Sequence, residues 1–326
     1  MVSKSQIPTL TDVLAAKKRI KPYLPRTPLT RYDNLGEMFS AEVFVKHENH
    51  LPTNAFKIRG GINLIAQLSD EDRRKGVISA STGNHAQSIS YASRLFGVKA
   101  TIVMPVSANP HKVEATKRLG GNIIQYGKDF DEAREFAEKV AVEQDIRYVH
   151  SANEPQLIAG VATLTLEIFE DLPDVNAIIV PIGGGSSASG ACVVAREINE
   201  KAEVIGVQSS AAPAAYLSWK EGRLVTESKM ETFAEGLATR VGFELTQEIL
   251  RASLSDIVLV TDDEIKKAIL LAIEKTHNLV EAAGASPLAA LVKLQAKLKG
   301  KKVALVMSGA NILPSQLKEI LNQQGA

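Results

Sequence analysis

Short, almost wholly apolar segments alternate with amphipathic segments along most of this chain, and this alternation constrains its fold more than any other feature. The run from Ala177 to Pro181 reads Ala-Ile-Ile-Val-Pro, and the run from Val303 to Met307 contains no polar side chain. Strands that are apolar on both faces are typical of parallel sheets covered by helices on each side. The repeated strand–helix units therefore predict doubly wound α/β topology, with ligands bound at the carboxyl ends of the strands.

Residue patterns place the individual elements. Strands are predicted at 42–46, 76–79, 100–104, 122–126, 147–150, 177–181, 204–208 and 303–307. Helices are predicted at 9–21, 58–68, 83–96, 111–119, 130–144, 156–170, 187–199, 261–277, 287–299 and 314–322, with Thr11 as a cap of the first. A chain of 326 residues suits two domains, and the polar stretch from His150 to Gln156 suggests a boundary near residue 151. A ligand would then bind between the domains.

Charge and cysteine content narrow the class of protein. Lys plus Arg number 38 and Asp plus Glu number 37, without a basic tail or stripe, so we expect no nucleic-acid partner. Cys192 is the only cysteine, which excludes an internal disulfide and fits a reducing compartment. Residues 1–25 lack the apolar core of a signal peptide, and no apolar run is long enough to span a bilayer. We therefore expect a soluble, cytoplasmic protein with no membrane partner.

Lys57 lies where a loop enters a helix. Phe56 and Ile58 flank it, and the turn marked by Pro52 and Asn54 precedes it. Backbone N–H groups and apolar side chains disfavour the ammonium form and make the amine a usable nucleophile. Taken alone, this stretch fits a solvated surface lysine better, so the argument for a reactive amine depends on turns further along the chain.

The first of these turns, Ser81-Thr82-Gly83-Asn84-His85, joins a strand to a helix. Helix N-terminal N–H groups bind anions such as carboxylates, and glycine lets a ligand approach the backbone closely. The Asn84 amide is able to hydrogen-bond such a ligand. N-capping by Ser81 or Thr82 is the simpler explanation of this turn when it is considered by itself.

The second turn runs from Gly183 to Gly190 and reads Gly-Gly-Gly-Ser-Ser-Ala-Ser-Gly between the apolar strand and a helix. Successive glycines carry a high entropic cost and fit a nest of N–H groups around a phosphate. The turn lacks the Gly-Lys-Ser/Thr ending of a P-loop, and Ala188 replaces the third glycine of a dinucleotide-binding turn. The next strand ends at Gln208, where a ribose-binding acid is expected. These features weaken the alternative of a dinucleotide oxidoreductase.

The third turn, Ser308-Gly309-Ala310-Asn311, follows the strand at 303–307, so its hydroxyl belongs to the same edge as the other turns. Capping ahead of the last helix is the other explanation. Together, the turns and Lys57 supply an amine for an aldehyde, a nest for its phosphate and a site for an amino acid's carboxylate. Pyridoxal phosphate requires these three features.

With these motifs in this order and spacing, the chain resembles the fold-type II pyridoxal-phosphate family of serine/threonine dehydratases and serine racemases, over residues 27–317 or so. The motifs that carry the resemblance are residues 55–60, residues 81–87, the glycine turn and Ser308-Gly309. The resemblance implies two doubly wound α/β domains with parallel-type sheets, as in the β subunit of tryptophan synthase. Residues 1–66 plus 152–326 would form a large cofactor-binding domain and residues 67–151 a small mobile domain. A homo-oligomer, a dimer in the family, is also implied.

The resemblance implies a role for each motif. Lys57 would form a Schiff base with pyridoxal 5'-phosphate, and Phe56 would flank the pyridine ring. Asn84 would bond the ring hydroxyl and Ser308 the ring nitrogen, with Glu281 nearby. The remaining cofactor contacts would come from Gly183, Gly184, Gly185, Ser186 and Ser187 around the phosphate, and the substrate contacts from Ser81, Thr82, Gly83, Asn84 and His85.

Some positions depart from the family pattern. Ala55 and Ala310 replace a common serine and glycine, and Ser186 replaces the fourth glycine of the loop. Thr82 stands where racemases carry a serine as second acid or base, and its β-branch restricts the hydroxyl, which favours elimination over racemisation. A divalent-metal site in part of the family would need carboxylates at two positions, which are Gln208 and Ala214 here, so we expect no metal.

These features predict a pyridoxal-phosphate-dependent dehydratase, an ammonia-lyase, acting on a 3-hydroxy amino acid such as L-threonine or L-serine to give a 2-keto acid and ammonia. Lys57 and Thr82 are the predicted catalytic residues. An amino-acid (serine) racemase, a dehydratase of 3-hydroxyaspartate or of a hydroxyectoine-derived substrate, and a non-catalytic binding protein are the alternatives left open.

Three residues with metal-binding side chains are interpreted as structural. His47 and His50 would face opposite ways on an extended segment, which argues against a zinc site. Cys192 falls on an Ala- and Val-rich helix, and we expect it to be packed rather than reactive.

Overall fold

The computed structural model describes residues 7–228 and 230–323. Contacts divide the chain into a smaller unit, Met1–Leu24 with Lys57–Val161, and a larger unit, Pro25–Phe56 with Ala162–Ala326. The chain therefore passes from one unit to the other directly before Lys57. The predicted division into residues 1–66 plus 152–326 and a mobile 67–151 concerns cofactor binding and motion, and it stays a prediction.

The larger unit contains a six-stranded sheet in the order β1-β2-β10-β7-β8-β9. All neighbouring strands run parallel except β1, which is antiparallel to β2. The central strand β7 is buried at every residue, as its apolar composition predicts for a sheet covered on both faces. The strands are β1 (Leu29–Arg31), β2 (Glu42–His47), β7 (Ala177–Pro181), β8 (Glu203–Ser209), β9 (Asp256–Val260) and β10 (Lys302–Met307).

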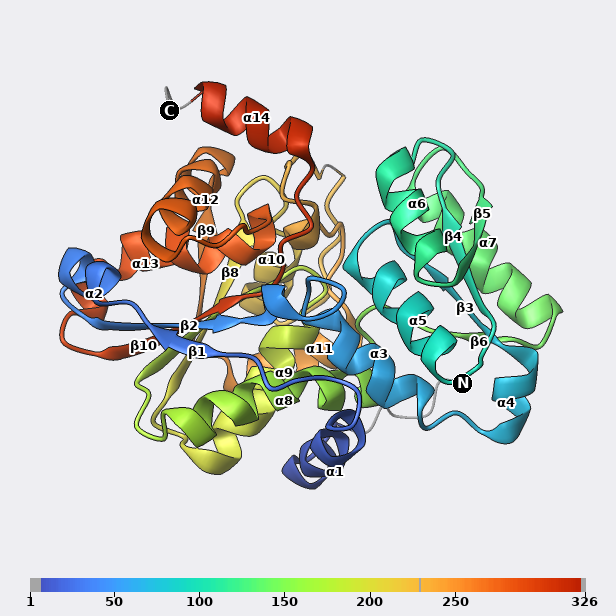
Figure 1. Cartoon of the computed structure of the whole chain (residues 1–326), viewed down its shortest axis with the longest axis horizontal. Coiled ribbons are helices and arrows are strands. Elements are labelled where there is room, and N and C mark those ends of the chain that lie inside the picture. Colours follow the sequence, from blue (N-terminus) through green and yellow to red (C-terminus); the bar gives the residue numbers. More distant parts are fainter. Residues whose placement is uncertain (1–6, 229, 324–326) are drawn as a thin grey trace. The chain divides into compact units, whose positions relative to one another are not determined.

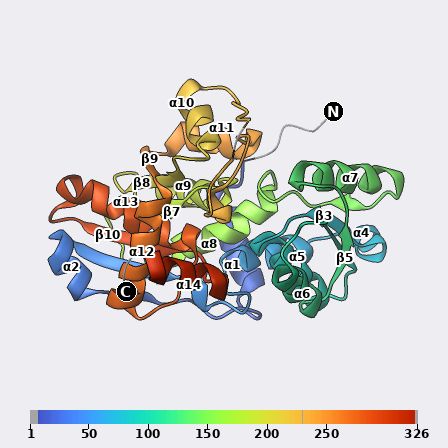
Figure 2. The same cartoon turned by 90° about the horizontal axis from the view of Figure 1, so that it is seen from above.

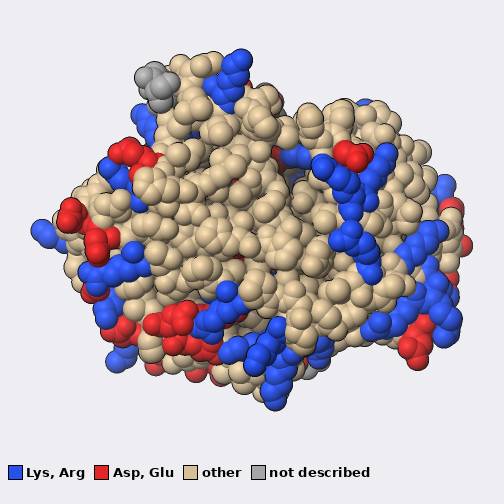
Figure 3. All heavy atoms as spheres, in the orientation of Figure 1, with Lys and Arg blue, Asp and Glu red and all other residues tan. Residues whose placement is uncertain are grey.

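Helices cover both faces of this sheet (Figure 1). Residues of α2, α12 and α13 form one hydrophobic core with β2, β7 and β10, and α9 packs against β7 and β8. Basic and acidic side chains share the face of this unit that Figure 3 shows. The helices that begin in the larger unit are α2 (Asp33–Phe39), α9 (Ser186–Ile198), α10 (Ala214–Glu221), α11 (Glu244–Ser253), α12 (Asp262–Thr276), α13 (Ala282–Leu298) and α14 (Pro314–Gln323), with 3₁₀ turns at Glu48–His50 and Glu235–Leu237.

The smaller unit contains a parallel four-stranded sheet in the order β5-β4-β3-β6. Figure 2 shows α7 on one side of this sheet and α5 and α6 on the other. Its strands are β3 (Val77–Ala80), β4 (Ala100–Met104), β5 (Gly121–Gln125) and β6 (Arg147–Tyr148), and its helices are α1 (Leu10–Ile20), α3 (Lys57–Ile65), α4 (Asp70–Lys75), α5 (Asn84–Leu95), α6 (Pro110–Arg118) and α7 (Phe130–Glu143), while α8 (Pro155–Asp171) continues into the larger unit. The doubly wound α/β fold predicted from the alternating pattern is confirmed.

Gly61 brings α3 and α5 of the smaller unit into close contact. A Cβ atom on Gly61 would lie 2.3 Å from Ser88 Oγ. That hydroxyl donates a hydrogen bond to the Lys57 carbonyl at 2.7 Å. The first turn of α3, which carries Lys57, is therefore fixed against the helix that begins at Asn84.

Some predicted element ends are wrong. Thr9 rather than Thr11 caps the first helix, because Thr9 and Asp12 form a reciprocal capping box. The short elements β1, α2, α4, α10, α11 and β9 have no counterpart in the predicted set. The helix predicted to start at Pro287 starts at Ala282 instead. Proline cannot donate to the carbonyl four residues earlier, and the Ser286 hydroxyl donates to that Ala283 oxygen at 2.8 Å.

The prediction that His47 and His50 face opposite ways is wrong. The segment from Glu48 to His50 is a 3₁₀ turn, in which side chains three residues apart eclipse each other. The two rings stack with centroids 4.8 Å apart. His47 Nε2 hydrogen-bonds Tyr32 Oη at 3.0 Å, and His50 Nε2 hydrogen-bonds Asn278 Oδ1 at 2.7 Å. Residues 7–228 and 230–323 hold no group of three metal-binding side chains.

Two further features bear on the class of protein. Cys192 is 1% exposed and burial raises the pKa of its thiol to about 12, so it is packed, as predicted. No helix in the part of the chain that the structure describes is long and apolar enough to cross a membrane.

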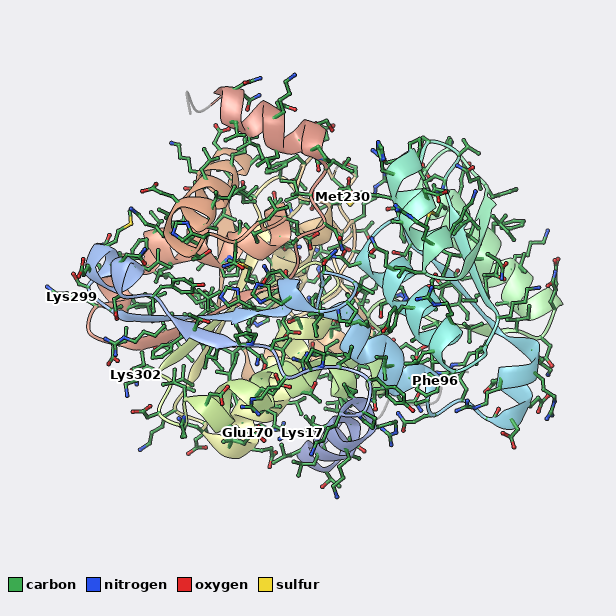
Figure 4. All side chains as sticks on the ribbon, in the orientation of Figure 1. Lys17, Phe96, Glu170, Met230, Lys299 and Lys302 are labelled. Atoms are coloured by element: carbon green, nitrogen blue, oxygen red, sulfur yellow. The ribbon has the colours of Figure 1, made fainter. Side chains whose placement is uncertain are left out.

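A buried ion pair joins β2 to α8 in the larger unit. Lys46 Nζ donates to Glu167 Oε2 at 2.6 Å and to the Thr27 carbonyl at 2.7 Å. The side chains of Lys46 and Glu167 are 0% and 8% exposed. The same helix carries Glu170, which Figure 4 labels. Glu170 pairs with Arg26 at the surface.

Replacing one partner of this pair, Glu167→Leu, should lower the free energy of unfolding by about 3–5 kcal/mol, because the Lys46 ammonium would lose its buried counter-charge. The double variant Lys46→Met with Glu167→Leu should recover most of the loss, since an apolar pair of similar volume carries no desolvation cost. Urea denaturation of the wild type, the single variant and the double variant measures the free energy of unfolding of each. Equal losses of this free energy in the single and double variants would contradict the prediction.

Candidate active site

Lys57, the first residue of α3, has an amine that is held and partly desolvated. Its Nζ donates to the Ser151 carbonyl at 2.8 Å. Burial lowers the pKa of Lys57 from 10.5 to about 8, in the direction that its apolar neighbours predict. At that pKa about a tenth of the amine is neutral at pH 7, so it serves as a nucleophile or a base.

Two imidazoles of the smaller unit lie near Lys57 and stay neutral. Burial lowers the pKa of His85 to about 3 and that of His150 to about 4, and the charge of Lys57 adds to both shifts. His85 Nε2 hydrogen-bonds Ser79 Oγ at 3.1 Å, whereas its buried Nδ1 has no partner among the described residues. Lys57 is therefore the one member of this group that is protonated at neutral pH.

The turn from Ser81 to His85 leads from β3 into α5. Ser81 Oγ accepts hydrogen bonds from Gly83 N at 3.2 Å and Ala86 N at 3.3 Å, so it takes part of the predicted capping role. Gly83 occupies the N-cap position. A Cβ atom added to Gly83 would meet no described atom within 4 Å. The fold does not require this glycine, and the open space at a helix N-terminus fits the close approach of an anionic ligand.

The smaller unit thus brings together Lys57 and the turn that contains Thr82 and Asn84, both of which were predicted from sequence. Sequence reasoning missed His150 and Ser151. Both follow β6, which pairs with β3 in the same parallel sheet. The carboxyl ends of parallel neighbours meet at one edge of a sheet, and that rule is the signal that points to these two residues.

The glycine turn of the larger unit follows β7 and opens α9, as predicted. A Cβ on Gly183 would lie 2.2 Å from the Gly236 carbonyl oxygen, and Gly185 has a φ of +90°. Thr246 Oγ1 donates to the Gly184 carbonyl at 3.0 Å. Close packing against the Gly236 backbone and a hydrogen bond from the Thr246 side chain therefore fix this turn, and sequence reasoning missed both residues.

The turn fits the phosphate of the predicted cofactor. The Ser187 hydroxyl is buried and has no hydrogen-bond partner within the described residues. Leaving such a group unpaired costs about 1–3 kcal/mol, so its place at a helix N-terminus indicates a missing acceptor. A phosphate oxygen meets that need and is favoured by the N–H groups and dipole of α9.

Phe56, Ser308 and Glu281 come together in the larger unit. The Ser308 carbonyl accepts a hydrogen bond from Phe56 N at 3.0 Å, and Glu281 N donates to the Gly309 carbonyl at 3.0 Å. A Cβ on Gly309 would lie 2.5 Å from Glu281 Oε1, so the carboxylate lies against this turn. Ser308 does not cap the last helix, because that helix begins at Pro314.

The fold is α/β, with a lysine of lowered pKa in the smaller unit and a glycine turn that fits a phosphate in the larger unit. Comparison with known proteins agrees. The model of the family "Pyridoxal-phosphate dependent enzyme" matches residues 20–309, and the chain belongs to this family. Its fold is fold type II, which it shares with solved structures of a threonine deaminase and a serine racemase.

The chain is 40% identical over 315 residues to the L-threonine ammonia-lyase of Thermotoga maritima. The aligned region covers 97% of this chain and 78% of that protein. The processed form of threonine deaminase isoform 2 from Solanum lycopersicum has a TM-score of 0.93 at 31% identity, covering 100% of this chain and 99% of that one. Maize serine racemase has a TM-score of 0.92 at 31% identity, covering 98% of each chain.

The variant Gly83→Ala should separate a ligand-binding role of this glycine from a structural one. The added methyl group meets open space, so the thermal midpoint without ligands should stay within about 2 °C of the wild type, as expected for a change that costs under about 0.5 kcal/mol. The KM for the substrate should rise about tenfold or more, because the methyl group occupies the approach to the backbone. Gly183→Ala is the matched control and should lower the midpoint. A normal KM for Gly83→Ala would contradict a ligand at this turn.

The reactivity of Lys57 should depend on pH in one direction. The neutral amine is the nucleophile, so the rate of covalent attachment to pyridoxal phosphate should rise about tenfold per pH unit below pH 8 and level off above it. Borohydride trapping and peptide mass spectrometry measure the rate at Lys57. A midpoint near 10.5, the ordinary lysine value, would show that the amine is not desolvated.

Proposed function

We propose that this protein is a pyridoxal-phosphate-dependent dehydratase, an ammonia-lyase, that removes water from a 3-hydroxy amino acid such as L-threonine or L-serine. The products are a 2-keto acid and ammonia. The observation that carries the proposal is the Lys57 amine, whose pKa is lowered to about 8 while it is held by a backbone carbonyl. The naming of the Thermotoga maritima relative as an L-threonine ammonia-lyase supports the choice of substrate class.

Each group of residues has a part in this reaction. When bound, pyridoxal phosphate supplies an aldehyde for covalent attachment and an electron-withdrawing ring that stabilises negative charge at the substrate Cα. The residues from Gly183 to Ser187 would hold its phosphate and Asn84 its ring hydroxyl. Ser308 would offer the ring nitrogen a neutral hydroxyl, with Glu281 beside it, and Phe56 would flank the ring. A neutral partner keeps the ring a moderate electron sink, which suits elimination better than transamination.

Lys57 acts as the general base in the proposed step. Its neutral amine takes the Cα proton, and the Cβ–O bond breaks as the leaving oxygen gains a proton, for which the cofactor phosphate would be the donor, and departs as water. The N–H groups at the start of α5, with the residues from Ser81 to His85, bind the substrate carboxylate. The released enamine tautomerises to an imine, and water converts the imine to the 2-keto acid and ammonia.

An amino-acid racemase is the second candidate, and the similarity to maize serine racemase favours it. Racemisation needs a second acid or base on the opposite face of Cα, for which the predicted residue is Thr82. The β-branch of threonine restricts the hydroxyl to fewer rotamers than serine has. We therefore propose that elimination dominates, with 3-hydroxyaspartate and hydroxyectoine-derived amino acids as further candidate substrates.

The finer expectations about the whole protein are also proposals. The single cysteine supports a reducing, cytoplasmic location. Resemblance to the dehydratases supports a homodimer.

The variant Lys57→Ala should lose keto-acid formation by at least about 10⁴-fold, because it removes both the attachment point and the base. Incubation with L-threonine and L-serine, followed by assay of 2-ketobutyrate, pyruvate and D-serine, tests the wild type and the variant. D-serine as the main wild-type product would indicate a racemase. Keto-acid formation retained by the variant would overturn the proposed role of Lys57.

A further inference from the structure

The residues that follow β6 form a turn on which the position of the Lys57 amine depends. His150 Nδ1 accepts hydrogen bonds from the backbone N–H groups of Ala152 and Asn153, both at 2.9 Å. A ring nitrogen that accepts hydrogen bonds carries no proton, so the His150 proton belongs on Nε2. Protonation of Nδ1 would break both bonds, and the low pKa of His150, about 4, keeps them intact at neutral pH.

Glu154 fixes the other end of the same turn. Its backbone N–H donates to the Ala152 carbonyl at 2.9 Å. Its carboxylate pairs with Arg147 at 3.0 Å, a residue of β6. Ser151 therefore lies between two tied residues, and the direction of its carbonyl is set by hydrogen bonds that Ser151 itself does not make.

We propose that His150 is a positioning residue for Lys57: its imidazole closes the turn and thereby aims the Ser151 carbonyl at the Lys57 amine. The inference rests on the proposed role of Lys57 as attachment point and base. A carbonyl accepts a hydrogen bond from an ammonium and from a neutral amine alike, so the contact survives loss of the proton. In the neutral amine, an N–H directed at Ser151 leaves the lone pair free to point at a reacting atom.

The two nitrogens of the His150 imidazole can be tested separately. Nδ1 accepts the hydrogen bonds of the turn, whereas Nε2 is the nitrogen that could contact reactants. Asparagine places an acceptor oxygen at about the position of Nδ1, whereas glutamine places its polar group at about the position of Nε2. His150→Asn should therefore keep the turn, and His150→Gln and His150→Leu should lose it.

Two measurements test the three variants. Crystal structures of the cofactor-free variants, in which the Lys57 amine is free, should show the contact from Lys57 Nζ to the Ser151 oxygen in His150→Asn and its loss in the other two. Kinetics should show kcat within about threefold of the wild type for His150→Asn and a fall of about 10- to 100-fold for His150→Gln and His150→Leu, with KM little changed, because a displaced base costs rate rather than binding.

The outcomes that would overturn the proposal are distinct. A loss in His150→Asn as large as in His150→Leu would contradict the role of Nδ1, and retention in His150→Gln alone would show that Nε2 contacts the reactants. Circular dichroism checks folding, and the Asn and Gln variants decide the question if the Leu variant does not fold. A wild-type protein without keto-acid formation would overturn the proposed function, while the crystallographic comparison would still test His150.

Discussion

Desolvation of a single lysine amine is the physical constraint on which the proposed chemistry of this protein depends. An exposed lysine is almost fully protonated at neutral pH and is neither a nucleophile nor a base. Burial lowers the pKa of Lys57 to about 8, and the histidines beside it are neutral, so they add no second positive charge. A backbone carbonyl as hydrogen-bond partner keeps the amine in place without the counter-charge that a carboxylate would bring, which would raise the pKa again.

Some glycines of the chain are needed for close packing, and the structure distinguishes these from a glycine that packing does not require. Gly61 lets two helices touch, and Gly183 lets a loop lie against the backbone at Gly236. Gly83 has open space where a side chain would be, so neither packing nor a positive φ accounts for it. A glycine that the fold does not need, placed at a helix N-terminus, is the kind of position where a ligand supplies the missing contact.

Much of the fold and part of the site followed from local sequence. Strands such as β7 and β10 were predictable because both faces are buried, which leaves no polar residue in 177–181 or in 303–307. The elements α10, α11 and β9 were not predicted: the two helices mix apolar with polar residues, whereas β9 is apolar at four of its five residues and could have been found. His150, Ser151, Gly236 and Thr246 were missed for another reason. The contacts of Ser151 and His150 involve backbone groups. Gly236 and Thr246 contact a turn that is far from them in the sequence, and no local motif predicts such a contact.

By itself, the sequence determined the order of the strand–helix units, the position of Lys57 at a helix start and the glycine turn after an apolar strand. These properties are local, because each depends on a few neighbouring residues. Only the tertiary structure decided that the Lys57 amine is desolvated, that the buried Ser187 hydroxyl has no partner within residues 7–228 and 230–323, and that the rings of His47 and His50 stack. Burial and hydrogen-bond satisfaction depend on residues far apart in the chain, so they exist only once the chain has folded.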